Sequence, residues 1–205
     1  MKILPFFQKT ALLCSVLVFF SFTNLGQNDW QLAKEQSGIK VFTRSGKAEM
    51  KEYRGEAVIE APVEEVFAVL NKFDEYSTWM PSCLENKIIK RVSDAEFYQY
   101  NVTDAPWPVS DRDSVMKTKI TKQASGVITI ELTAVPDYIP EKKGRIRVPT
   151  FKGLWKLTPK NGKTEVIYEG KPSTGGNIPT WLANSSVVDI PLNTLTNLKS
   201  LVIGK

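Results

Sequence analysis

The alternation of apolar and polar residues along most of the chain predicts β-strands rather than helices. Segments 38–44 (GIKVFTR) and 51–62 (KEYRGEAVIEAP) alternate with a period of two, as expected for strands with one buried face. Three later pairs of alternating segments are joined by short turn signals, so each pair predicts an antiparallel hairpin. The pairs are 84–92 with 96–102, 113–122 with 127–134, and 145–158 with 164–170. Asn161–Gly162, inside the last pair, is the strongest hairpin signal in the chain.

Helical patterns occupy three other stretches of the chain. A short helix is predicted over residues 30–36. Pro62 opens a second helix, because a proline in the first turn lacks only a donor that has no partner there. The C-terminal segment 175–202 begins its helix near Pro179 and is expected to kink near Pro191. Its apolar stripe consists of Leu182, Val188, Leu192, Leu195, Leu198 and Val202.

This order of elements predicts an α+β fold in one domain. A large antiparallel sheet has to cover its inner face, and the C-terminal helix is the only predicted element long enough to lie across it. We therefore expect a curved antiparallel sheet that wraps around the C-terminal helix, with a hydrophobic cavity between them. The domain is expected to span residues 27–205, a length suited to a single core.

The alternation also indicates which side chains face that cavity. Met116, Thr118 and Ile120 share one side of their strand, and Lys117 and Lys119 share the other. The predicted inner wall is mostly aliphatic, with a few hydroxyls as polar points, and suits a largely apolar ligand oriented by a few hydrogen bonds. The ligand contacts predicted from these patterns are Met116, Thr118, Ile120, Ile130, Tyr168, Leu192 and Leu195.

The segment 104–113 (DAPWPVSDRD) places Trp107 between two prolines, which excludes it from a central strand or helix. Two interpretations remain open for Trp107: it folds back onto the core, or it is held on this stiff loop at the rim of a site. Arg112 and Asp113 are expected to form a structural ion pair that fixes the base of this loop.

The N-terminus has the features of a secretory signal peptide. Lys2 and Lys9 make it positive, and the apolar run 11–22 is shorter than the roughly 20 residues that a transmembrane helix requires. We expect residues 1–26 to be removed and the mature chain to be exported, either to the periplasm or out of the cell. An uncleaved membrane anchor is the less favoured alternative.

Composition excludes several classes of function. The chain has no histidine, so Ser–His and Cys–His nucleophile pairs and imidazole metal ligands are ruled out. Cys83 is the only cysteine beyond the predicted signal peptide, which excludes an intramolecular disulfide in the mature chain. The net charge of +5 is not gathered into a basic run interleaved with aromatics, so we expect no nucleic-acid binding, and also no metal and no cofactor.

Four segments, in this order and spacing, resemble the START (StAR-related lipid-transfer) domains of the helix-grip, or SRPBCC, superfamily. They are VEEVFAVLNKFDEYSTWMPSC, PWPVSDRD, PEKKGRIR and GGNIPTWLANSSVVDIP. The similarity runs from about Trp30 to the C-terminus, and suggests an exported bacterial member. It implies a monomeric carrier of hydrophobic ligands whose cavity is gated by loop 104–111, with Trp107, and by the C-terminal helix, both of which yield at a membrane. It also implies cavity positions for Tyr168 and Gln99, while Thr118 stands where some sterol-type members have an arginine.

The sequence therefore predicts a protein that holds or shuttles a lipid, sterol or similar apolar molecule, with a membrane surface as transient partner. The alternative is a helix-grip enzyme, a cyclase or hydrolase acting on an apolar substrate. No carboxylate appears among the predicted inward-facing residues, so we expect no enzymatic activity. A third interpretation is a groove that binds the hydrophobic segment of a partner protein.

Overall fold

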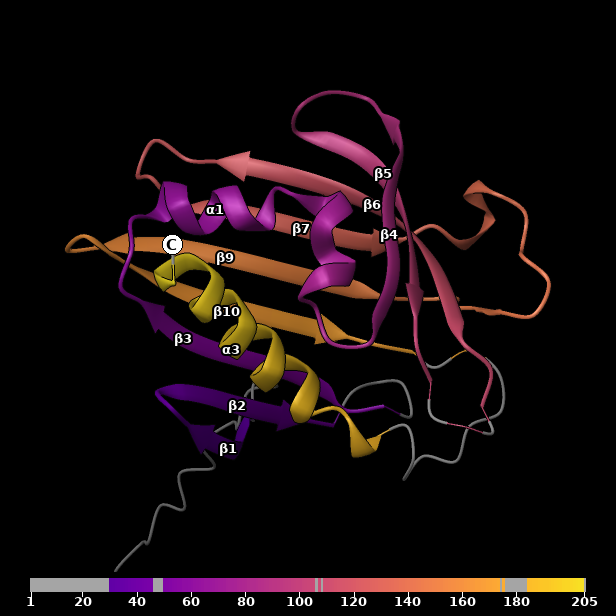
Figure 1. Cartoon of the computed structure of the whole chain (residues 1–205), viewed down its shortest axis with the longest axis horizontal. Helices are drawn as coiled ribbons and strands as arrows, with labels where there is room; N and C mark the ends of the chain where they lie inside the picture. The colour runs from indigo at the N-terminus through magenta and orange to yellow at the C-terminus, as the bar shows by residue number, and fades with distance from the viewer. Residues whose placement is uncertain are drawn as a thin grey trace, which may run out of the picture.

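The computed structural model describes residues 30–45, 50–105, 107, 109–173, 175 and 184–204, in which an antiparallel sheet curves around a C-terminal helix (Figure 1). The predicted signal peptide and the predicted helix start at Pro179 lie outside these residues. The strands are β1 (Gln31–Gln36), β2 (Ile39–Arg44), β3 (Glu52–Ile59), β4 (Cys83–Arg91), β5 (Glu96–Thr103), β6 (Arg112–Lys122), β7 (Ile128–Ala134), β8 (Ile146–Arg147), β9 (Lys152–Lys160) and β10 (Lys163–Lys171). The helices are α1 (Val63–Leu70), α3 (Asp189–Ile203) and the 3₁₀ helices η1 (Phe73–Thr78) and η2 (Pro136–Tyr138).

The described strands form one sheet in the order β1-β2-β3-β10-β9-β7-β6-β5-β4, and β8 pairs with β6 in parallel. Most neighbours in the sheet are also neighbours in the chain, because the predicted hairpins form. Asn161 and Gly162 both have positive φ, 52° and 78°, as a two-residue hairpin turn requires. The contact between β3 and β10 joins the early and late parts of the chain.

Two predicted elements differ from the structure. Residues 30–36 do not form a helix, because Gln31–Gln36 is the edge strand β1. Ser37 and Gly38 both have positive φ and turn the chain into β2, so a glycine interpreted as a helix stop belongs to a hairpin turn. The single strand predicted over 145–158 is also wrong, since 148–151 separates β8 from β9 and the two strands pair with different partners.

Two helices, rather than one, cover the inner face of the sheet (Figure 1). Helix α3 crosses β3 closely at Gly55, where an added Cβ would lie 2.6 Å from Leu195 Cδ1. Pro191 lies in the first turn of α3, where its missing donor costs little, so the predicted kink is replaced by a helix start. Helix α1 packs beside α3 and buries Val63 and Val66 against the same face.

These two helices fill one half of the concave face with a solid apolar core. The side chains at the centre of that core are almost fully buried and belong to one continuous hydrophobic cluster. They include Ile59, Leu70, Ile120, Ile130, Leu157, Val166, Leu195 and Leu198. The remaining half of the concave face, toward the start of β6 and the end of β10, is where a cavity can form.

A smaller core lies on the opposite face of the sheet, under the segment 135–147. Its polar centre is Asp113, which is 1% exposed and accepts hydrogen bonds from Arg147 Nε at 2.9 Å and Arg147 Nη2 at 3.0 Å. Tyr100 also donates its hydroxyl to Asp113, at 3.0 Å. The predicted pair of Arg112 and Asp113 is therefore wrong, because adjacent residues of a strand point to opposite faces.

The pairing of Asp113 predicts a specific loss of stability in acid. Burial alone raises the pKa of Asp113, but hydrogen bonds from Arg147 and Tyr100 and the charge of Arg147 outweigh it, so the net pKa is lowered. A lowered folded-state pKa stabilises the protein above the unfolded value of about 3.9, and this contribution is lost as the pH falls through the folded-state pKa. Asp113→Asn should lower the free energy of unfolding at pH 7 by about 3 to 5 kcal/mol, since it leaves Arg147 buried without an anion.

Urea denaturation between pH 7 and pH 2 measures this effect. The difference between wild type and Asp113→Asn should begin to shrink below about pH 4, where Asp113 of the unfolded chain takes up a proton, and should be lost only below the lower folded-state pKa. Asp94→Asn, at an exposed hairpin turn, is the control and should follow the wild type. A constant difference across the whole range would contradict the assignment.

Candidate ligand-binding site

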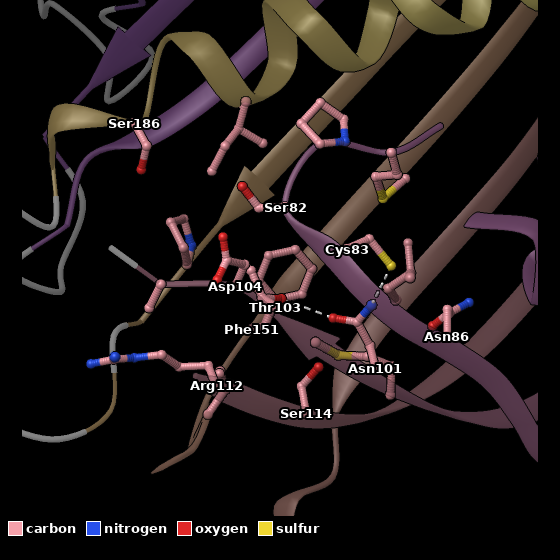
Figure 2. A pocket seen from close by; sticks show the side chains of 18 of the residues that line it. Ser82, Cys83, Asn86, Asn101, Thr103, Asp104, Arg112, Ser114, Phe151 and Ser186 are labelled. Carbon is pink, nitrogen blue, oxygen red and sulfur yellow. Dashed lines mark hydrogen bonds between the residues drawn. The ribbon is translucent and has the colours of Figure 1, made fainter. Parts of the chain in front are cut away.

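A cavity of about 350 Å³ lies between the sheet and the start of α3 (Figure 2). It occupies the end of the sheet where β4, β6 and β9 begin and where β5 and β10 end. At roughly 30 Å³ per water molecule, this space corresponds to about a dozen waters, which is more than a packing defect. The volume lies near the lower end of the range for small-molecule pockets, about 300 to 1,000 Å³.

One wall of the cavity is polar and is built by β5 and β6. Alternate residues of each strand point inward, so cross-strand neighbours form a row of paired side chains along the wall. From the interior toward the mouth, the pairs are Gln99 with Met116, Asn101 with Ser114, and Thr103 with Arg112.

The inner end of this wall is held by a chain of amide hydrogen bonds. Asn86 donates to the Phe73 carbonyl at 2.7 Å and to Gln99 Oε1 at 3.1 Å. Gln99 in turn donates from Nε2 to the Thr118 hydroxyl at 3.1 Å. Because Asn86 also anchors η1 through Phe73, this network fixes both the wall and the 3₁₀ helix beside it.

The middle of the polar wall is also tied together, as the dashed lines in Figure 2 show. Asn101 donates from Nδ2 to Cys83 Sγ and to the Glu85 carbonyl, both at 3.2 Å, and its Oδ1 accepts from Thr103 at 3.0 Å. Burial raises the pKa of the Cys83 thiol, and its hydrogen bonds with Asn101 and with the Glu85 backbone only partly offset this.

The opposite wall is aromatic. The Trp155 and Tyr168 rings stack with centroids 4.0 Å apart, and Tyr53 meets Tyr168 edge-on at 5.3 Å. The Tyr53 hydroxyl donates to the Tyr168 hydroxyl at 2.9 Å. Gly170 makes this arrangement possible, because a Cβ there would overlap the Tyr53 ring. Burial raises the pKa of both tyrosines, so both hydroxyls stay protonated.

The two tyrosine hydroxyls leave one donor unused. They share a single hydrogen bond, so the hydroxyl proton of Tyr168 has no acceptor among the described residues. Tyr168 lines the cavity. The aromatic wall therefore presents one hydrogen-bond donor on an otherwise apolar surface.

The structure places the predicted contact residues in two groups. Gln99, Met116 and Tyr168 line the cavity, and Thr118 lies directly behind Gln99. Four others are buried in the solid half of the core and do not line the cavity: Ile120, Ile130, Leu192 and Leu195. The reason is α1, which fills the space that these residues were expected to share with a ligand.

Sequence reasoning missed the polar wall. The predicted wall was mostly aliphatic, whereas Asn101, Thr103, Ser114 and Arg112 line the cavity in the structure. The signal was present, because Gln99, Asn101 and Thr103 are polar residues at every second position of one strand.

Trp107 stands out from the surface near this end of the molecule. Its side chain is 93% exposed, which excludes the interpretation that it folds back onto the core. Its neighbours Pro106 and Pro108 lie outside the described residues.

The chain is similar to known proteins along most of its length. The START domain family model matches residues 13–198. The chain belongs to the START domain family. It is 45% identical over 174 residues to an uncharacterized protein of Pseudomonas aeruginosa, covering 84% of this chain and 86% of that one.

Solved structures agree with this assignment. The crystal structure of a STAR-related lipid transfer protein fragment from Xanthomonas axonopodis is 40% identical, with a TM-score of 0.79, and the match covers 85% of this chain and 98% of that one. Human StAR-related lipid transfer protein 5 shares the fold at 21% identity, with a TM-score of 0.76 and coverage of 87% and 88%. The predicted helix-grip fold is confirmed.

The described residues contain neither a membrane-spanning helix nor a group of metal ligands. None of their helices is both long and apolar enough to span a membrane. They also contain no group of three or more Cys, Asp or Glu side chains placed to hold a metal ion.

The buried amide network predicts a measurable difference between two threonines of β6. Thr118→Val removes the acceptor of Gln99 Nε2 and should lower the free energy of unfolding by about 1 to 3 kcal/mol, because that donor loses its partner where water is excluded. Thr121→Val changes an exposed threonine of the same strand and should stay within about 0.5 kcal/mol. Equal changes in urea denaturation would contradict the network.

Proposed function

We propose that this protein is a carrier that holds one lipid, sterol or other hydrophobic small molecule in the cavity between its sheet and α3. The observation that carries the proposal is the cavity itself, with an aromatic wall of Trp155 and Tyr168 facing a fixed row of polar groups. Apolar surface with a few placed hydrogen-bonding groups is typical of small-molecule sites. Its relative from Xanthomonas axonopodis is named a lipid transfer protein, in line with this proposal.

A carrier of this kind is needed because transfer of an alkyl chain from a membrane through water costs much free energy. Moving an alkyl chain from a membrane into water costs about 0.8 kcal/mol per methylene, so a chain of about twelve carbons faces on the order of 10 kcal/mol. A dry cavity removes most of this penalty if the ligand passes directly from membrane to protein. In this proposal the carrier acts as an exported monomer, after removal of residues 1–26.

Contact with the membrane is proposed to occur through Trp107. Its indole is almost fully exposed and lies in the connection between β5 and β6, both of which contribute to the cavity wall. Tryptophan favours the membrane interface because its ring is amphipathic. Loop 104–111 and α3 then act as the gate through which the ligand passes.

The chemistry of the cavity favours binding over turnover. A nucleophilic thiol requires a lowered pKa, whereas burial raises that of Cys83. The pKa values of Tyr53, Tyr76 and Tyr168 are also raised by burial, which keeps all three hydroxyls protonated, so none supplies a phenolate to act as a base. We therefore propose a carrier rather than the alternative cyclase or hydrolase.

Filling the cavity should abolish binding. Met116 lines the cavity, and Met116→Trp places a larger ring in it; Lys119→Trp adds the same ring on the exposed side of the same strand. Fluorescence titration with the neutral probe N-phenyl-1-naphthylamine should show the Kd of Met116→Trp raised about tenfold or more, with Lys119→Trp unchanged. Equal affinity in both variants, at comparable melting temperatures, would rule out this cavity as the site.

Loss of the exposed indole should weaken membrane contact alone. Trp107→Ala should reduce partition onto vesicles of phosphatidylethanolamine and phosphatidylglycerol about tenfold, because the exposed indole is the group that enters the membrane interface. The melting temperature should stay unchanged, because a side chain that is already exposed contributes little to folding. Val92→Ala changes an exposed apolar residue just beyond the other end of β4 and serves as control. Unchanged partition, or a lowered melting temperature, would argue against the gate.

A further inference from the structure

In the described part of the chain, the cavity is lined by two charged side chains, and they are not paired with each other. Asp104 directly follows β5 and Arg112 begins β6, so both lie at the mouth end (Figure 2). Neither takes part in an ion pair with any described residue. Asp104 is exposed and Arg112 is half-buried, so both charges meet solvent at the mouth and are accessible to a charged group of a ligand.

Arg112 has most of its hydrogen-bonding capacity unused. A guanidinium has five N–H donors, and the hydrogen bond that Arg112 forms within the described chain goes to the Ser110 carbonyl. Burial lowers the pKa of Arg112, and Asp111 opposes this only by its charge at a distance, since the Asp111 carboxylate accepts from the Ala105 backbone instead. The half-buried guanidinium thus has no ion-pair partner among the described residues.

Ser114 provides a second, independent observation. It lies two residues after Arg112, on the same face of β6, and is only 4% exposed. Its hydroxyl has no hydrogen-bond partner among the described residues, and Figure 2 shows it turned toward the cavity. The residues opposite, Asn101 and Thr103, are already bonded to each other. Arg112 and Ser114 are therefore the donors of this wall that have capacity to spare among the described residues, and Figure 2 shows the Arg112 guanidinium extended away from Ser114.

We propose that the half-buried side chain of Arg112 turns back toward the cavity and, together with Ser114, binds the oxyanion of a single-chain amphiphile, a carboxylate or a phosphate, whose alkyl chain lies against Trp155 and Tyr168. This inference rests on the proposed carrier function and narrows its ligand class. Charge-assisted hydrogen bonds from guanidinium to oxyanions are among the strongest in proteins. A cavity of about 350 Å³ favours one alkyl chain over two.

Asp104 allows a test of the proposal, because neutralising Asp104 and neutralising Arg112 should change the affinity for an anion in opposite directions. Its carboxylate lines the same end of the cavity and repels an anion held by Arg112. If Arg112 acts through its charge, neutralising Asp104 strengthens the binding of an anionic ligand, while neutralising Arg112 weakens it. A ligand without charge should respond to neither change.

The experiment is displacement of N-phenyl-1-naphthylamine by dodecanoate and by 1-dodecanol, which share a chain and differ in headgroup charge. Arg112→Gln should raise the Kd of dodecanoate about 10- to 100-fold, and Ser114→Ala about threefold to tenfold. Asp104→Asn should lower the Kd of dodecanoate. The Kd of 1-dodecanol should stay within about twofold in all three variants.

Two further ligands identify the source of the oxyanion. Monododecyl phosphate and inorganic phosphate are compared with dodecanoate, and tighter binding of either amphiphile supports the proposal and names the headgroup. Binding of inorganic phosphate at Arg112 as tightly as monododecyl phosphate would overturn it, because the site would then recognise phosphate without a chain.

Two other results would also overturn the inference, and they are distinguishable. If Arg112→Gln weakens dodecanoate and 1-dodecanol equally, the oxyanion subsite is absent although the carrier function stands. If the wild type binds neither amphiphile nor the probe, the carrier function fails as well. Should Arg112→Gln lower the melting temperature, Ser114→Ala, which deletes one oxygen, decides the question alone.

Discussion

The inner face of the sheet has to be covered, and the way the helices cover it determines the rest of the structure. Helix α3 is seated tightly on β3, because Gly55 leaves room for Leu195 and Pro191 at the contact. Helix α1 fills the neighbouring space, and together they bury one half of the concave face in a continuous apolar core. At the other half, the described helices leave space unfilled, and the cavity lies there between the sheet and the start of α3. The site is thus a consequence of where packing ends.

Hydrogen bonding separates the parts of the cavity that support the fold from the parts that can serve a ligand. Asn86, Gln99 and Thr118 bind one another, and Asn101 binds its strand neighbours, so these polar groups are satisfied without a ligand. The Ser114 hydroxyl and most donors of Arg112 lack partners in the described chain. The same distinction appears on the aromatic wall, where the tyrosine pair uses one of its two protons.

The sequence predicts the sheet well because its signals are local. Alternation and the Asn161–Gly162 turn specify hairpins without any knowledge of tertiary contacts. Ser37–Gly38 shows the limit of local signals, since a glycine after a short segment can end a helix or turn a hairpin. Pairing across the sheet decides between the two.

The site was harder to predict, because alternation gives the face of a strand but not the depth along it. Met116 and Ile120 share one face of β6, yet only Met116 reaches the cavity, since α1 fills the space near Ile120. The pairing of Asp113 with Arg147 depends on a segment 34 residues away that folds over the opposite face. That pairing releases Arg112 to face the cavity, which the sequence alone does not reveal.

The account depends on a cavity that holds a guest, and native mass spectrometry of detergent-free protein tests this most directly. We expect a noncovalent adduct of one small molecule per chain, removed by organic extraction and identified in the extract as an amphiphile. The bare mass of the polypeptide in every charge state, from protein that also leaves added N-phenyl-1-naphthylamine non-fluorescent, would contradict the account.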